Sequence, residues 1–297
     1  MPALFFHYKL GQDLLSNTLS NIRNEISQNI NYYNMFNQGW DNLYYHFPKW
    51  NYYKSVGNRS HKKNVAIFFE NAINYIKNNN LENDSKYSNL IYGILNHYTM
   101  DTLIHPFVNY QVKHLKLSHT KVEFMMDSII KNNYNNKIYK TIIPKIKFDK
   151  KYLDFINYIY NKTYKINNMG KVWQRSHNNG YILYRYFIND KHGIKAFLYR
   201  IIDVFNFSDF KLHENTFYVK KFDNKLLNNN KSNWNNPNDK DNIYNYSLEE
   251  LYNNTLKICI KANKIAYKVL HKNNNIQELL DYIKNLNIKN MQELLQK

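Results

Sequence analysis

Residues 87–106, YSNLIYGILNHYTMDTLIHP, carry the pattern that decides the fold. Leu90 and Ile94 follow the four-residue spacing of an α-helix, and His97 and Asp101 project within or beside the same apolar arc. Burying an imidazole and a carboxylate is costly unless each has a hydrogen bond, an ion pair or a cation. The stretch therefore predicts an amphipathic helix that brings partnered polar side chains into a core.

His105 stands directly before Pro106. A proline disfavours the α conformation at the residue that precedes it. The pattern therefore predicts a helix over about residues 87–104, with His105 at its end. The imidazole of His105 can still turn toward the centre that His97 and Asp101 face.

His119 and Glu123 lie four residues apart in a second helical pattern, over about residues 120–133. This spacing places both side chains on one helical face, where they can share one ion. Thr120 and Glu123 also match a capping box, in which Glu123 would instead bond a main-chain amide at the start of the helix. Asp127 continues the face one turn later, and we expect it to support the site or to be solvated.

Three more potential ligands lie upstream. Residues 11–30 show the apolar spacing of one amphipathic helix, and His7 sits just ahead of it. Residues 32–53 are dense in aromatic side chains and are predicted to form a structured loop around Asp41. His61 begins the next helical pattern. The aromatic residues are expected to wall the entrance of a site or, alternatively, to pack in the core.

The rest of the chain also shows helical patterns. We expect a single helical domain over residues 1–297, with its metal site built from residues 1–130 and a polar linker at about 228–242. Ser247 and Glu250 form a capping box. Further helices, those before the linker as core helices, are predicted at residues 152–166, 181–188, 196–205, 247–272 and 276–295.

Composition favours an all-α fold. The 297 residues include 7 glycines and 5 prolines, too few for the turns of a β-barrel or sandwich, and 43% are hydrophobic, enough for a core. Cys259 is the single cysteine, which excludes an internal disulfide framework and cysteine-rich zinc modules. Any metal site in this chain must therefore use histidine, aspartate and glutamate.

The first residues, MPALFFHYKLGQDLL, lack a basic segment followed by a long apolar one. They do not match a secretory signal peptide, and apolar runs such as residues 65–69 are far shorter than the roughly 20 residues of a transmembrane helix. We expect a cytoplasmic protein without a transmembrane segment.

The formal net charge is +18, from 41 Lys and Arg against 23 Asp and Glu. Such a charge attracts nucleic acid, anionic lipid or a phosphate ester. The lysines are scattered among frequent Asn, Ile and Tyr, which equally fits a general compositional bias. Charge alone therefore selects no partner.

The joint pattern of histidines and carboxylates predicts a metal centre more strongly than any member does alone. Each buried member needs a polar partner, and several divalent ions that share carboxylates would satisfy all of them. Sites of imidazole and carboxylate ligands suit zinc.

The first 130 residues or so resemble the zinc-dependent phospholipase C family, whose helical domain holds three zinc ions. The resemblance rests on the order of the ligand-type residues: His7, Asp41, His61, His97 and Asp101 in HYTMD, His105, and His119 and Glu123 in HTKVE. It implies an all-α, multi-helix globular domain in which these eight residues bind zinc (two to three ions), with Asp101 as the bridging carboxylate.

This chain departs from the family pattern in three places. Secreted members use the main chain of an N-terminal tryptophan as a zinc ligand, whereas this sequence begins Met1-Pro2, so one zinc site is expected to be incomplete or differently filled. The spacing from Asp101 to His105 is shorter than in secreted enzymes. The lipid-binding β domain of toxin members has no counterpart in the helical tail.

The resemblance implies a metal-dependent hydrolase, a phospholipase C-like phosphodiesterase that cleaves a phospholipid or related phosphodiester with a metal-activated water. Asp41 is our choice of general base, with a plain ligand role as the alternative. Fungal single-strand nucleases share the trinuclear zinc architecture, so a nuclease or nucleotidase is an alternative, and nucleic acid is a possible partner. A non-catalytic helical zinc-binding protein is the third hypothesis.

Overall fold

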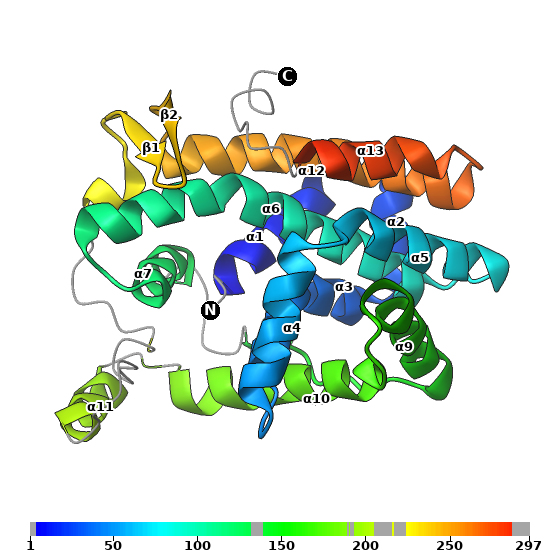
Figure 1. Ribbon diagram of the computed structural model, residues 1–297, viewed down its shortest axis with the longest axis horizontal. Helices are drawn as coiled ribbons and strands as arrows, with labels where there is room; N and C mark the ends of the chain where they lie inside the picture. Colours follow the sequence, from blue (N-terminus) through cyan, green and yellow to red (C-terminus); the bar gives the residue numbers. More distant parts are fainter. Residues whose placement is uncertain are drawn as a thin grey trace.

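The structure, a computed structural model, describes residues 4–131, 139–188, 190, 193–204, 216 and 224–286. Within these ranges the chain is all-α except for one two-stranded sheet (Figure 1). Up to the long central helix the elements are α1 (Leu4–Asn17), α2 (Ser20–Gln28), α3 (Ile30–Asn37), the 3₁₀-helix η1 (Gly39–Tyr45), α4 (Trp50–Lys62), α5 (Val65–Asn78) and α6 (Ser85–Leu115).

After α6 the chain continues through shorter helices to a β hairpin and two C-terminal helices. These elements are α7 (His119–Lys131), α8 (Tyr139–Ile142), α9 (Lys150–Tyr164), α10 (Met169–Ile182), the π-helix η3 (Leu183–Ile188), α11 (Ile194–Val204), the 3₁₀-helix η5 (Asn224–Leu227), β1 (Trp234–Asn236), β2 (Asp239–Tyr244), α12 (Leu248–His271) and α13 (Ile276–Leu286).

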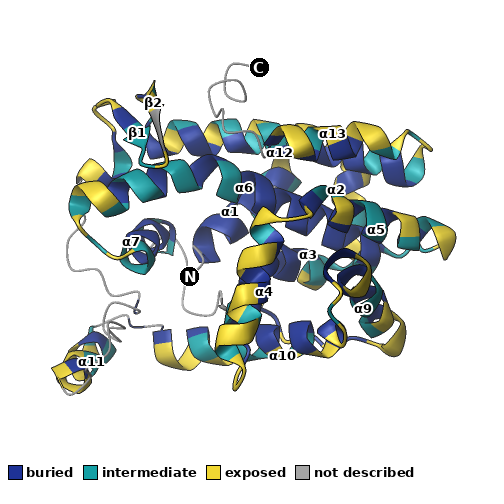
Figure 2. Cartoon of the chain, viewed as in Figure 1, coloured by how far each residue is buried: buried dark blue, intermediate teal, exposed yellow. Residues whose placement is uncertain are grey.

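Helix α6 runs through the middle of the molecule and is buried along most of its length (Figure 2). Its first half contributes to a core formed with α3, α5, α9 and α13, and its second half to a core formed with α1, α7 and the start of α12. The side chains of α6 that are predicted as metal ligands lie between these two groups of apolar residues. The helix therefore places them at the centre of the fold.

The prediction that this helix ends near His105 is wrong, because α6 continues through Pro106 to Leu115. A proline inside a helix removes one main-chain hydrogen bond and costs about 3 kcal/mol. Phe107 and Val108, directly after it, are buried in the second core. Burial of this apolar face offsets the cost of the proline, which the local sequence rule does not include.

The predicted single helix over residues 11–30 is two helices, α1 and α2. Leu19 between them is extended, with φ −61° and ψ 147°. The guanidinium of Arg23 donates hydrogen bonds to the main-chain carbonyls of Leu15 (2.6 Å) and Ser16 (3.0 Å), near the end of α1. These bonds satisfy carbonyl groups that a continuous helix would have bonded internally.

Residues 32–53, predicted as a loop, are also largely helical: they contain most of α3, all of η1 and the start of α4. Gly39, with a positive φ of 51°, separates α3 from η1. The element that carries Asp41 is therefore a short 3₁₀-helix and not an open loop. Its apolar side chains, such as Trp40 and Leu43, are fully buried.

The structure confirms the predicted capping box before the first of the two C-terminal helices. Ser247 and Glu250 form the predicted capping box at the start of α12, with both reciprocal hydrogen bonds present. The polar stretch at 228–242 contains β1 and much of β2, which pair in antiparallel fashion. Of the predicted helix over 276–295, residues beyond 286 lie outside the described residues.

Among the described residues, none of the helices combines the length and the apolar character needed to cross a lipid bilayer.

Candidate metal centre

The structure brings all eight predicted ligand residues to one place. They come from five elements: His7 from α1, Asp41 from η1, His61 from α4, His97, Asp101 and His105 from α6, and His119 and Glu123 from α7. Two of the three upstream residues lie elsewhere than predicted, since His7 is inside α1 and His61 is in the last turn of α4 and not at the start of α5. Helical spacing placed the start of α1 too late, and it did not identify α4 as a helix.

Asp101 is the centre of the first group of side chains. One carboxylate oxygen, Oδ1, lies 3.3 Å from Nε2 of His7, and the other, Oδ2, lies 3.3 Å from Nε2 of His61 and 3.4 Å from Nε2 of His97. Asp41 approaches the same two rings from η1, at 3.4 Å from His61 and 3.9 Å from His97. Two carboxylates thus face three imidazole nitrogens in a largely buried space.

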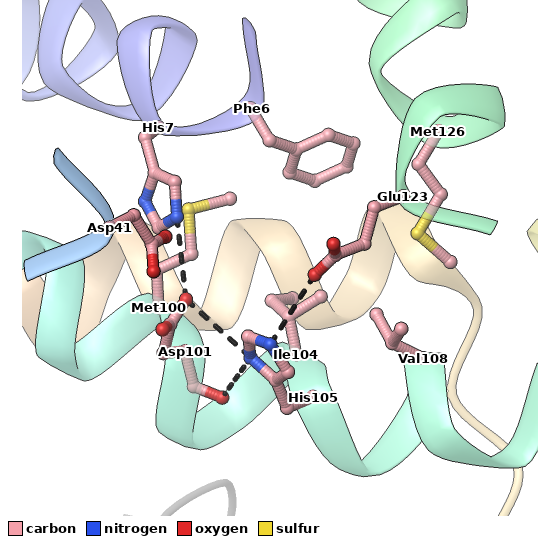
Figure 3. A pocket seen from close by; sticks show the side chains of 10 residues that line it. All are labelled: Phe6, His7, Asp41, Met100, Asp101, Ile104, His105, Val108, Glu123 and Met126. Carbon is pink, nitrogen blue, oxygen red and sulfur yellow. Dashed lines mark hydrogen bonds and ion pairs between the residues drawn. The ribbon is translucent and has the colours of Figure 1, made fainter. Parts of the chain in front are cut away.

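His105, His119 and Glu123 form the second group. Oε1 of Glu123 lies 3.0 Å from Nε2 of His119 and 3.4 Å from Nε2 of His105. Nδ1 of His105 is 3.5 Å from Oδ1 of Asp101, which joins this group to the first (Figure 3). Glu123 thus faces the histidines, as the metal-site interpretation predicts.

The main chain orients two of the rings. Nδ1 of His61 lies 2.8 Å from the carbonyl oxygen of Gly57, and Nδ1 of His105 lies 3.0 Å from that of Asp101. An Nδ1–H group donating to a carbonyl fixes the tautomer, so that Nε2 presents its lone pair on the opposite side of the ring. Both Nε2 atoms point at carboxylates, so a proton on the ring or a cation shared with the carboxylate satisfies each contact.

The spacing of the donor atoms fits zinc. Two ligand atoms on one tetrahedral zinc ion lie about 3.3 Å apart, because the bonds to nitrogen and oxygen are about 2.0–2.2 Å long. Most nitrogen–oxygen separations in the first group are 3.3 or 3.4 Å, longer than the roughly 2.8 Å of a charge-assisted hydrogen bond. The groups therefore stand where ligands of shared ions would stand.

A cavity of about 20 Å³ lies among these side chains, large enough for one water molecule or ion. Its polar lining is His7, Asp41, Asp101, His105 and Glu123, and Figure 3 shows their polar atoms pointing toward one another. Its apolar lining comes from Phe6, Met100, Ile104, Val108 and Met126. Apolar side chains lower the local dielectric constant and so strengthen electrostatic interactions beside them.

The ring pKa values show how strongly this site attracts a positive charge. Burial acts to lower the pKa of His61, but the carboxylates of Asp101 and Asp41 outweigh it and raise the pKa to about 10. Burial is likewise outweighed at His105, where Asp101 and Glu123 raise the pKa to about 9. His97 is completely buried, and burial lowers its pKa to about 3. His97 therefore stays neutral, as a metal ligand must.

Gly39 allows η1 to pass close to His97. A Cβ atom on residue 39 would overlap the imidazole ring of His97, and the positive φ also favours glycine. Trp40, next in the chain, packs edge-on against His61 and His97, with ring centroids 5.3 and 6.2 Å apart. Trp40 thus packs against the rings of two candidate ligands and also belongs to the hydrophobic core.

Asn42 and His177 also hold η1 in place, and sequence reasoning did not identify either. The Asn42 side chain donates to the carbonyls of Met35 (2.9 Å) and Gly39 (3.2 Å), and its Oδ1 lies 3.2 Å from Nδ1 of His177. His177 is completely buried on α10. It comes from 135 residues further along the chain, so no local spacing could have indicated the contact.

Asp127, which lies on α7, links this helix to α1. It is completely buried on α7, and its two oxygens accept hydrogen bonds from the main-chain N–H groups of Phe5 and Phe6, each 3.0 Å long. Burial raises the pKa of Asp127, while these two donors act in the opposite direction. The carboxylate anchors the first turn of α1 directly beside His7.

We expect Asp127→Ala to lower the free energy of unfolding by about 3 kcal/mol, since it leaves two buried N–H donors without their acceptor. Asp127→Asn, which keeps one acceptor oxygen, is expected to lose about half as much. Urea unfolding of chelator-treated proteins measures both values without a contribution from bound metal. An alanine variant as stable as the wild type would show that the hydrogen bonds from Phe5 and Phe6 to Asp127 do not stabilise the fold.

A larger, open pocket of about 550 Å³ lies next to the candidate ligand residues. Its lining includes Asp41, Asp101, His105 and Glu123, so it reaches the candidate metal centre. The lining also includes one face of α4, where Lys54, Asn58 and Lys62 recur every fourth residue. Tyr44 and Tyr98 contribute to the lining as well, and the Tyr44 hydroxyl donates to Oδ1 of Asn58 at 2.7 Å. The pocket offers positive charge to an anionic ligand.

Comparison with known proteins gives one match. The family model described as "Zinc dependent phospholipase C" matches residues 6–169, a segment that holds all eight ligand residues and the face of α4 that lines the pocket. No curated protein and no solved structure matches the chain.

Proposed function

Because the chain belongs to the zinc-dependent phospholipase C family, we propose that it is a zinc-dependent phosphoesterase that hydrolyses a phospholipid or related phosphodiester. One structural observation carries the proposal: imidazole and carboxylate atoms at zinc-ligand separations form the floor of an open pocket. A structural zinc site closes its coordination shell, whereas a catalytic site keeps access for substrate. The open pocket therefore favours a catalytic site over a purely structural one.

We assign zinc binding to all eight clustered residues, in two groups joined by Asp101. The first group holds His7, Asp41, His61, His97 and Asp101, and the second holds His105, His119 and Glu123. Two to three ions would use this number of donors, because carboxylates can bridge. Support for Asp101 as the bridge is its position within 3.5 Å of His7, His61, His97 and His105.

Bound zinc would lower the pKa of a water molecule and polarise a phosphoryl oxygen. The chain's own residues then have distinct tasks. Asp41, which lines both the small cavity and the open pocket, accepts the proton of the attacking water on a carboxylate oxygen. Lys54 and Lys62 attract the anionic substrate and hold it against the floor. The oxygen of the water bonds to phosphorus, the bond between phosphorus and the glycerol oxygen breaks, and the glycerol oxygen takes up a proton, which yields a diacylglycerol and a phosphorylated head group.

The second candidate function is a single-strand nuclease or nucleotidase with the same metal site. Two lysines of α4 favour this function. Lys54 and Lys62 both line the pocket, where each can contact one phosphate group of a nucleic-acid strand. Tyr44, which is partly exposed in the same pocket, offers a ring on which a base can stack, whereas Tyr98 is only 3% exposed. We place the lipid first because the family match is to phospholipase C.

The substrate is tested by assaying one preparation on two substrates. A short-chain phosphatidylcholine below its micelle concentration and a single-stranded oligonucleotide are each assayed before and after chelation, with zinc added back. The proposal expects chelator-sensitive release of phosphocholine. Chelator-sensitive cleavage of the oligonucleotide alone would establish the nuclease instead, and inactivity on both would favour the non-catalytic alternative.

Zinc affinity is expected to depend on pH over an unusual range. His61 and His105, with pKa values of about 10 and 9, carry protons at pH 7 in the metal-free site, and zinc must displace them. Apparent affinity should rise between pH 7 and 9 by about tenfold per pH unit for each displaced proton. Competition with a chromogenic chelator measures it. Ordinary histidines would give an affinity that is flat above pH 7, which would contradict this account.

A further inference from the structure

Helix α11 carries its apolar side chains on the outside. The prediction that residues 196–205 form a core helix is wrong for the described part, residues 196–204, because most of its large apolar side chains are about half or more exposed. The exposed fractions are 63% for Ile194, 64% for Phe197, 51% for Leu198, 47% for Ile201, 49% for Ile202 and 76% for Val204. Figure 2 shows this helix as a largely exposed element at the edge of the molecule, beyond the end of α10.

Polar contacts hold α11 in this orientation. Oδ2 of Asp190 accepts a hydrogen bond of 2.7 Å from the main-chain N–H of Ala196, and the Lys195 ammonium donates to the carbonyl of Tyr186 at 2.7 Å. Ala196 and Asp203 are the buried positions of the helix. The inner face is thus small and polar, and the apolar face is directed outward, which reverses the usual arrangement of a surface helix.

Positive charge flanks the apolar face. At 100° per residue, Ile194, Leu198 and Ile201 mark the middle of the apolar arc, and Lys195 and Arg200 lie on its two sides. Both acidic groups of the described residues between 183 and 204 are turned inward, with Asp190 5% and Asp203 8% exposed. The charges that α11 presents to a partner are therefore basic.

We propose that α11 docks on an anionic phospholipid surface, with its apolar arc among the acyl chains and Lys195 and Arg200 at the head groups. An outward arc of Ile, Leu and Phe bordered by Lys and Arg is the composition of a helix that lies in a membrane interface. A second copy of the chain fits less well, because a two-fold contact between α11 helices would bring the basic side chains of both copies together.

The docking helix is connected to the metal centre through η3. The hydroxyl groups of Tyr184 on η3 and Tyr45 on η1 lie 2.9 Å apart in the interior, and η1 also carries Asp41. Docking of α11 would thus hold the protein at the surface in which a lipid substrate lies. This consequence rests on the proposed function, whereas binding of α11 to lipid does not.

The test is co-sedimentation of the full chain with vesicles of phosphatidylcholine, alone or with about 30% phosphatidylglycerol. We expect binding to the anionic vesicles, reduced by about tenfold or more in the triple variant Phe197→Ser, Leu198→Ser, Ile201→Ser, whose positions are exposed and remote from the core. Lys195→Gln with Arg200→Gln should weaken binding less, and only to the anionic vesicles.

A matched control replaces three exposed apolar residues elsewhere on the surface: Leu19→Ser, Ile67→Ser and Ile243→Ser. It should bind vesicles as the wild type does. Equal binding by the α11 variant, or no binding by the wild type, would overturn the proposal. A wild-type dimer that the α11 variant converts to monomer would do so too, by identifying a second copy as the occupant.

Hydrolysis of the soluble short-chain substrate is measured in parallel. The α11 variant should keep that activity while losing activity on anionic vesicles. Vesicle binding by a wild type that hydrolyses neither substrate would contradict the proposed function and leave the docking surface supported.

Discussion

Asp101→Asn is expected to remove zinc and to lower kcat/KM on a phosphodiester by about a thousandfold or more, a loss of about 4 kcal/mol in transition-state stabilisation. The carboxylate of Asp101 has an oxygen within 3.4 Å of His7, His61 and His97. An amide in its place has one oxygen, no negative charge and an NH₂ group that repels a cation. No other side chain in the first group faces three rings at such short range.

The matched control for this variant is Asp149→Asn. Asp149 is an aspartate outside the site that precedes α9 and caps its first turn, and asparagine caps a helix as well. Zinc content by elemental analysis and initial rates should both be normal in the control. An Asp101→Asn protein that retains its full zinc complement and its rate would refute the bridging role.

Asp41→Asn is expected to separate zinc binding from turnover. Asp41 lies at 3.4 and 3.9 Å from His61 and His97, looser than Asp101, and other donors of the first group remain when it is changed. We expect most zinc to remain and kcat to fall by about 10²–10⁴-fold, the usual contribution of a positioned general base. KM should change little, because no contact to the substrate is lost.

Zinc content and the pH profile of kcat distinguish the outcomes for Asp41. Loss of metal in proportion to activity would identify Asp41 as a ligand only. Full activity with full zinc would remove it from the chemistry altogether. Asp101→Asn, prepared in the same way, serves as the reference, because we expect it to lose activity through loss of zinc.

The sequence predicted the central helix, and it identified candidate ligands that the structure brings together, because both depend on local spacing. The four-residue steps from His97 to Asp101 and from His119 to Glu123 place each pair on one helical face, and the structure shows both pairs facing the same centre. The order of the eight residues indicated the family, which the family match confirms. Helix ends were less accurate, as at His105, because packing beyond Pro106 outweighs the local effect of proline.

What the sequence could not predict depends on distant contacts. Nothing near Asp127 in the chain shows that it accepts hydrogen bonds from Phe5 and Phe6, more than 120 residues away. Apolar spacing predicted a core helix over residues 196–205, but spacing cannot tell whether the apolar face of a helix turns inward. In α11 the side chain of Asp190 and the burial of Ala196 and Asp203 determine that orientation.

The central claim is that the clustered histidines and carboxylates bind zinc for hydrolysis. The most direct test is the zinc content of the purified full chain by elemental mass spectrometry, with hydrolysis of a chromogenic phosphodiester measured before and after chelation. The account predicts roughly two to three zinc ions per chain and activity that disappears with the metal and returns with added zinc. A chain that takes up no zinc and hydrolyses no phosphodiester would contradict it.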